Sequence, residues 1–165
     1  MLRHLVLAAL VSAAPAPAPV PGPGAVLSMH RALFAALDRG DADAVAAFVA
    51  PDLRGPPRTS ALFLLDAAGE PVVARGADAS RDLLAVLARG SRAAGGTWTT
   101  TMSREEAECH SSEVSYATFE FERVHEVDGR RVARRYLSSS LACYEAGAWR
   151  VFHWHVSPAP APKKP

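Results

Sequence analysis

The chain has 165 residues, a length that fits one domain with a substantial hydrophobic core. It carries 18 Lys and Arg and 17 Asp and Glu, so its formal net charge is +1. A charge so near zero, with both signs mixed along the chain, argues against a nucleic-acid-binding protein. It argues equally against a protein that basic residues hold on a membrane surface.

The N-terminal segment has the layout of a secretory signal peptide. A basic start that includes Arg3 precedes the apolar run 5–11, and the small residues Ser12 and Ala13 follow. The run is too short to cross a bilayer as a helix, so no integral membrane segment is expected after cleavage behind Ala13. We therefore predict a signal peptide at 1–13 and an exported protein, periplasmic or secreted. A misassigned start followed by a disordered tail is the alternative.

Two segments rich in proline and alanine flank the expected domain. Residues 14–24 should form an extended linker, because proline favours polyproline geometry. Residues 158–165 have a similar composition and should form a disordered tail. The folded domain is therefore expected at 25–157.

Three segments of the N-terminal half have their apolar residues at helical spacing. They cover 26–38, a short stretch between Asp41 and Pro51, and a stretch that starts at Asp78 or Ser80 and closes at the glycines from Gly90 on. Asp41 is suited to cap the second helix, because its side chain can accept from an early backbone N–H.

The other periodic segments alternate in hydrophobicity, which is typical of strands. Residues 61–65 and 72–74 flank a turn and predict a hairpin, and further strands are expected at 97–102, 105–109, 114–127, 132–144 and 149–157. Asp128-Gly129 is the strongest hairpin signal of the chain. Together these elements predict an α+β fold, with three helices packed on one face of a strongly curved, mostly antiparallel sheet.

The last predicted strand carries a distinctive set of residues: Gly147, Trp149, His153, His155 and Ser157. This pattern resembles the terminal strand of SnoaL-like, or nuclear transport factor 2-like, proteins, including the association domain of calcium/calmodulin-dependent kinase II. The Gly40-Asp41 junction after the first helix also resembles the family. The resemblance covers residues 26–157 and implies a cone-shaped fold, which hosts isomerases, dehydratases, cyclases and non-catalytic binding or oligomerising modules. At one position on the pocket side, the resemblance implies a basic residue in the kinase relative, and this chain has Ser140 there.

Strand pairing sorts the side chains of the C-terminal half into two faces. With Val114 opposite Cys143 and Ser140 opposite His153, one face should form a ligand pocket. Its predicted residues are His153, His155, Tyr136, Ser138, Ser140, Phe119 and Phe121. The other face should carry Phe152, Trp154 and Leu141. Because a large bare apolar face is unusual on a monomer, we predict a homodimer through it.

His153 and His155 should lie roughly 7 Å apart on one face of the strand. They predict the polar end of a pocket for a small apolar or anionic molecule. The alternatives are two histidines hydrogen-bonded at the sheet end without a ligand, and a metal site, for which spacing supplies no third ligand. No cofactor or metal is predicted. Arg123 and Arg134, near the hairpin tip, are expected in solvent.

The sequence assigns no catalytic residue, because no carboxylate between residues 114 and 157 falls on the expected pocket face. We therefore expect an exported small-molecule-binding protein. One alternative is an isomerase, dehydratase or cyclase that acts on a small apolar carbonyl compound, and another is a purely structural dimer module. Cys109 and Cys143 suggest a disulfide in an exported protein. The expected register separates them by about 9 to 10 Å, beyond the reach of a bridge unless a bulge intervenes.

Overall fold

A computed structural model of the chain describes residues 21–51, 61–65 and 70–160. The predicted signal peptide at 1–13, most of the predicted linker and the last part of the predicted tail lie outside the described residues. The described elements are helices α1 (Pro23–Asp38), α2 (Ala42–Ala46) and α3 (Ala77–Ala93), and strands β1 (Ala61–Leu65), β2 (Pro71–Arg75), β3 (Thr97–Cys109), β4 (Val114–Val127), β5 (Arg130–Glu145) and β6 (Ala148–Pro158). None of the described helices combines the length and the apolar character that a membrane crossing requires.

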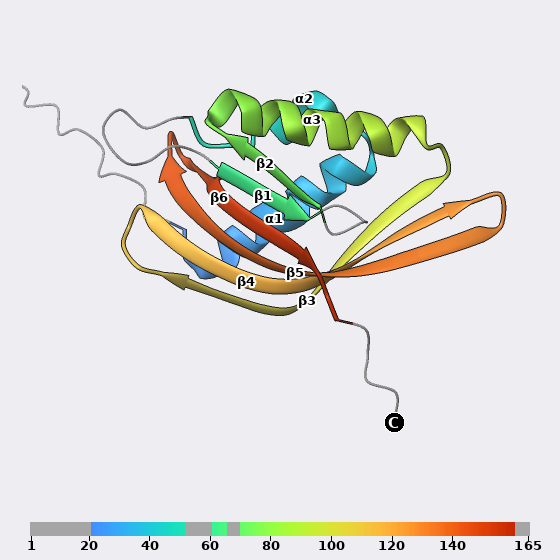
Figure 1. The fold of residues 1–165 in the computed structure, drawn as a ribbon. Coiled ribbons are helices and arrows are strands. Elements are labelled where there is room, and N and C mark those ends of the chain that lie inside the picture. Colours follow the sequence, from blue (N-terminus) through green and yellow to red (C-terminus); the bar gives the residue numbers. More distant parts are fainter. Residues whose placement is uncertain (1–20, 52–60, 66–69, 161–165) are drawn as a thin grey trace, which may run out of the picture.

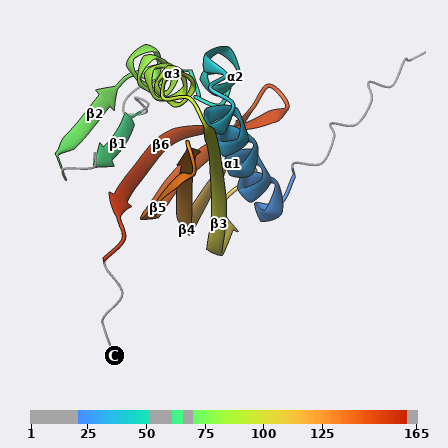
Figure 2. The ribbon, with the colours of Figure 1, turned by 90° about the vertical axis from the view of Figure 1, so that its right-hand side faces the viewer.

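The strands form one sheet in the order β2-β1-β6-β5-β4-β3. Neighbouring strands are antiparallel except β1 and β6, which run parallel. The three helices lie on one side of this curved sheet, as the two views of Figures 1 and 2 show. We call that side the covered face and the other the open face. The predicted α+β architecture is therefore confirmed.

The helix boundaries follow local chemistry. Helix α1 starts at Pro23, inside the segment predicted as linker, because proline suits the first turn, where its missing N–H has no intrahelical role. The Asp41 carboxylate accepts from the Ala44 N–H at 3.0 Å, so it caps α2 as predicted. Helix α3 runs through Gly90 to Ala93, which corrects the expectation that Gly90 would end it.

The hairpin of β4 and β5 has the predicted register, with Val114 opposite Cys143. Cys109 pairs with Ser115 on the other side of β4, so the two cysteines lie two strands apart. They are not joined by a disulfide. The two predicted strands at 97–102 and 105–109 form one strand, β3, whose register shifts between Ser103 and Glu106.

The register between β5 and β6 differs from the prediction by one residue. Ser140 lies opposite Trp154, and not His153, because the register shifts between Leu141 and Ala142 of β5. Leu141 pairs with His153 and Ala142 with Val151, so Phe152 of β6 is the extra residue of a bulge. A slip of one residue moves each following side chain to the other face. Trp154 therefore lies in the core and is 3% exposed, whereas His155 is exposed. The prediction that His153 and His155 face the helices, and that Trp154 faces away, is wrong.

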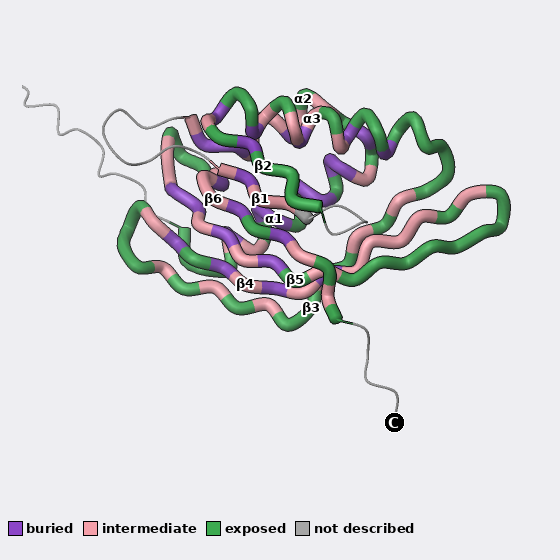
Figure 3. Tube along the Cα trace, in the orientation of Figure 1, coloured by how far each residue is buried: buried purple, intermediate pink, exposed green. Residues whose placement is uncertain are grey.

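The hydrophobic core fills the space between the helices and the covered face, where the buried residues of Figure 3 gather. Aromatic rings dominate its centre. Phe34 of α1 packs on Phe121 and Trp154, with ring centroids 4.7 and 5.8 Å apart respectively. Contacts of this kind stabilise a core beyond the area that they bury.

Candidate functional site

An apolar cavity of about 280 Å³ lies between the covered face, helices α1 and α3, and the hairpin of β1 and β2. The described residues of its lining come from seven elements and are Phe34, Leu37, Leu64, Val72, Leu83, Leu87, Phe121, Arg123, Tyr136, Trp154 and Val156. The Trp154 indole N–H donates to Ser138 Oγ at 2.7 Å and is therefore satisfied within the protein. Among the described residues, the remaining polar groups of the lining are the Arg123 guanidinium and the Tyr136 phenol. We call this space the apolar cavity.

A second cavity, of about 400 Å³, is lined by Trp98, Arg123, His125, Val132, Arg134 and Tyr136. We call it the polar cavity. Arg123 and Tyr136 line both spaces, so the two cavities meet at these side chains. Among the described residues, no carboxylate lines either cavity.

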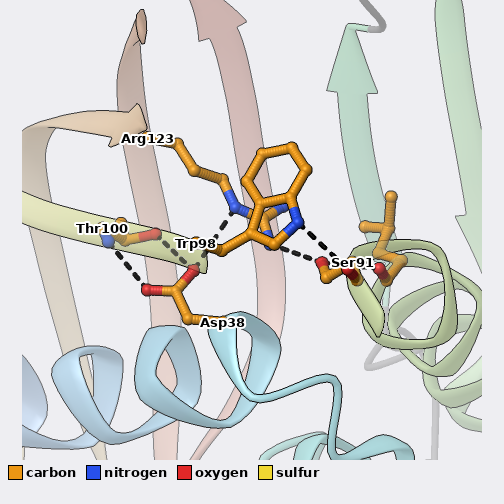
Figure 4. A network of polar contacts seen from close by, with 6 residues as sticks. Asp38, Ser91, Trp98, Thr100 and Arg123 are labelled. Atoms are coloured by element: carbon orange, nitrogen blue, oxygen red, sulfur yellow. Dashed lines mark hydrogen bonds and ion pairs between the residues drawn. The ribbon is translucent and has the colours of Figure 1, made fainter. Parts of the chain in front are cut away.

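Arg123 is held by groups from three elements, as Figure 4 shows. Its Nε lies 3.4 Å from Asp38 Oδ1 at the end of α1, and an Nη donates to Ser91 Oγ of α3 at 2.6 Å. Its guanidinium also lies 4.4 Å from the ring centre of Trp98 on β3. Burial lowers the pKa of Arg123 and the Asp38 carboxylate opposes this effect, while arginine remains charged in proteins. The network fixes a cation at the junction of the cavities.

Asp38 is itself committed to structural contacts. Its two carboxylate oxygens accept from the Thr100 N–H at 2.7 Å and from the Thr100 hydroxyl at 2.8 Å. These bonds tie the C-terminal end of α1 to β3 and orient the carboxylate toward Arg123. Asp38 therefore acts as the counter-charge of Arg123, while each of its oxygens accepts one hydrogen bond from Thr100.

Hydrogen bonds and a ring stack hold two side chains of the polar cavity's wall. The Trp98 indole N–H donates to the Ser91 carbonyl at 3.0 Å, and its ring stacks on His125 with centroids 4.1 Å apart. The His125 Nε2 donates in turn to the Gly95 carbonyl at 2.8 Å. These contacts anchor two aromatic rings of the wall to the C-terminal end of α3 and the turn that follows it.

A buried polar cluster lies between α1, which carries His30, and β5, which carries Ser140. The His30 Nε2 lies 2.7 Å from Ser140 Oγ, and its ring packs 4.8 Å from the ring centre of Phe119. The Nδ1 of this ring has no partner among the described residues. Burial lowers the pKa of His30 from 6.5 to about 3, because the apolar surroundings disfavour the charged ring. His30 is therefore neutral at physiological pH.

The predicted pocket residues divide into three groups. Phe121 lines the apolar cavity, and Tyr136 lines both cavities. Phe119, Ser138 and Ser140 lie on the same covered face but are buried in the core beside the cavity. His153 and His155 lie on the open face, since His153 pairs with Leu141 and its ring lies 5.2 Å from Phe63. Burial, and then the charge of His155, lowers the pKa of His153.

The predicted dimer residues also divide. Leu141 and Phe152 are half-buried, whereas Trp154 lines the apolar cavity. The bulge causes this exchange, because it turns Trp154 inward and the two imidazoles of β6 outward.

Sequence reasoning missed Arg123 and Asp38 as site residues. Arg123 was expected in solvent, but its side chain is 18% exposed and Asp38 lies beside it. The signal was present, because Arg123 follows Phe119 and Phe121 at period two and so shares their face. Asp38 likewise lies one helical turn after Phe34. Within the described ranges, no cluster of His, Cys, Asp and Glu could hold a metal ion.

Comparisons with known proteins connect this geometry to a fold. No protein-family model and no curated protein matches the chain. Solved structures do match: a protein named as a dehydratase of the NTF2-like family from Streptomyces avermitilis has a TM-score of 0.68 and 16% identity, over 84% of this chain and 97% of its own. The CaMKII hub of S. rosetta has a TM-score of 0.59 and 18% identity, over 86% and 99%.

A further similar structure is the hexachlorocyclohexane dehydrochlorinase LinA-type3 from Novosphingobium barchaimii LL02, with a TM-score of 0.60 and 9% identity, over 82% of this chain and 84% of its own. Identities this low establish a shared fold and leave activity open. The terminal-strand pattern of Trp149, His153 and His155 pointed to the same fold. The chain has the NTF2-like, or SnoaL-like, fold.

Proposed function

We propose that this domain binds a small, mainly apolar molecule in the apolar cavity. The observation that carries the proposal is the lining itself. Apolar side chains from helices α1 and α3 and from the sheet surround the space, and among the described residues Arg123 and Tyr136 bring the remaining polar groups to it. Small-molecule sites are usually built in this way, with few polar groups that orient the ligand.

A binding role is favoured over an isomerase or dehydratase role. Proton abstraction needs a base within hydrogen-bond reach of the substrate. Among the described residues no carboxylate or histidine lines the apolar cavity, and Asp38 is occupied by Thr100 and Arg123. The dehydratase and dehydrochlorinase activities named above belong to proteins that share the fold at 16% and 9% identity.

A thermal-shift experiment with neutral apolar molecules tests this proposal. Ligand at about 100 times its Kd should stabilise the protein by about 2.7 kcal/mol. Leu83→Trp should fill the cavity and abolish the shift, whereas Val86→Trp should preserve it, because Val86 lies on the same helix and is 55% exposed. An undiminished shift in Leu83→Trp would place the ligand elsewhere.

We also propose a homodimer through the open face. Tyr116 and Leu137 are 38% and 39% exposed there, and Leu141, opposite Tyr116, is half-buried. Covering this patch would remove apolar area from water. Light scattering should give a dimer mass for the native protein and a monomer mass for Tyr116→Arg, with Val86→Arg as the matched control. A monomeric native protein at micromolar concentration refutes the dimer.

Export remains a proposal that rests on the apolar run 5–11 and the small residues after it. Mass spectrometry of the protein from its native host should find an N-terminus behind Ala13. An intact Met1 on cytoplasmic protein would contradict export.

A further inference from the structure

Two arginines face each other in the polar cavity. Arg123 of β4 lies directly opposite Arg134 of β5, and both side chains line this space. Like charges directly opposite in a sheet are unfavourable. Asp38 balances Arg123, but Arg134 forms no ion pair with any described residue. The pair therefore leaves one positive charge without a counter-charge.

The two glutamates of β4 that flank Arg123 and His125 in sequence lie on the other side of the hairpin. Glu122 and Glu126 alternate with Arg123 and His125 along β4, so they point to the open face, where both contact Arg131. The described lining of the polar cavity thus has two cations, Arg123 and Arg134, and three aromatic rings, those of Trp98, His125 and Tyr136. This surface favours an anion, because an anion would relieve the repulsion between the arginines.

We propose that the polar cavity is an anion site, and that the ligand of this domain is an amphiphilic monoanion. Its apolar part occupies the apolar cavity, and its carboxylate or similar head group binds Arg134 and Arg123 in the polar cavity. Arg123 and Tyr136 line both cavities, so a molecule that extends past these two side chains would contact both spaces. This inference rests on the proposed function, since it assigns the head group of the molecule that the apolar cavity binds.

Arg134 is the side chain that distinguishes an anionic head group from a neutral one. Arg123 is already tied to Asp38 and Ser91, and its loss would disturb the fold. Arg134 is exposed and can be replaced without breaking an ion pair among the described residues. Arg130, on the same strand, is exposed and lies outside both cavities, so it serves as a matched control.

Isothermal titration with octanoate and with 1-octanol tests the proposal. These probes share a chain length and differ in charge. Arg134→Gln should weaken octanoate about tenfold, the range of a partly screened charge-assisted contact, and should leave 1-octanol unchanged. Arg130→Gln should leave both affinities unchanged. Raising the salt concentration should weaken octanoate alone.

The outcomes separate the two proposals. If Arg134→Gln changes neither affinity, or lowers both equally, the anion site is refuted while binding in the apolar cavity stands. If neither probe binds the native protein, or if Leu83→Trp binds the probes as tightly as the native protein does, the proposed function fails and the anion site fails with it.

Discussion

Lowering the pH should destabilise the fold through His30. Its ring is fully buried under α1, with Nε2 beside Ser140 Oγ and Nδ1 without a described partner. The folded-state pKa of His30 is about 3 and lies below the ordinary 6.5. Between these pH values the unfolded chain therefore binds a proton at this ring, and the folded protein does not. The part of the stability that depends on His30 is therefore present above pH 6.5 and is lost as the pH falls toward 3.

The magnitude follows from the proton uptake of the unfolded state. With one histidine titrating near 6.5 only when unfolded, the free energy of unfolding should fall by about 2 kcal/mol between pH 7 and pH 5. His30→Gln removes this contribution, because glutamine does not titrate. Urea unfolding at pH 7, 6 and 5 measures the free energy of both proteins.

The comparison of pH profiles isolates His30 from other groups. The native profile should fall more steeply than that of His30→Gln by about 2 kcal/mol over this range. His110→Gln, at an exposed position, should retain the native profile. Parallel profiles for the native protein and His30→Gln would refute the claim that this ring is buried and neutral.

Three further predictions concern Asp38 at the C-terminal end of α1, Gly40 just after that helix, and Gly90 inside α3. Asp38→Asn should lower the free energy of unfolding by about 2 to 3 kcal/mol, because it leaves the Arg123 cation without its counter-charge. Asp82→Asn, at an exposed position, should change this free energy little. Urea denaturation measures both variants. Gly40→Ala should lower the melting temperature, since Gly40 has φ +67° and an added Cβ would lie 2.6 Å from Arg92 Cβ. Gly90→Ala, inside α3 and clear of neighbours, should instead stabilise by about 1 kcal/mol. A destabilised Gly90→Ala or an unaffected Gly40→Ala would contradict the packing described.

The fold was predictable because its signals are local. Asp128-Gly129 set the register of β4 and β5, and the apolar stripe of α1 indicated the helix face that meets the sheet. The Asp41 cap likewise needs only residues within one turn.

The candidate site was predicted only in part, because the bulge in β6 leaves no clear trace in the sequence. The run from Val151 to Val156 has apolar or aromatic residues at every position, so alternation cannot distinguish the two faces. The Trp154 indole finds Ser138 only after the register shifts. Because of this one extra residue, Trp154 lies on the cavity side of the sheet, where the sequence predicted the two imidazoles.

The cavity itself depends on packing at a distance. Leu64 and Val72 come from a hairpin that joins the sheet beside β6, and Leu83 and Leu87 come from the helix that crosses above it. No local pattern shows whether such leucines fill a core or leave a space between them. Arg123 gains its role only through Asp38, far away in the sequence.

Methyl NMR titration with 1-octanol tests the central claim, that the apolar cavity receives a small molecule, most directly. The methyl signals of Leu64, Leu83 and Leu87 should shift together and saturate with one Kd, because these side chains line the cavity. Those of Leu137 and Leu141 on the open face should stay unchanged. Shifts confined to Leu137 and Leu141, with the cavity leucines unmoved, would contradict the account.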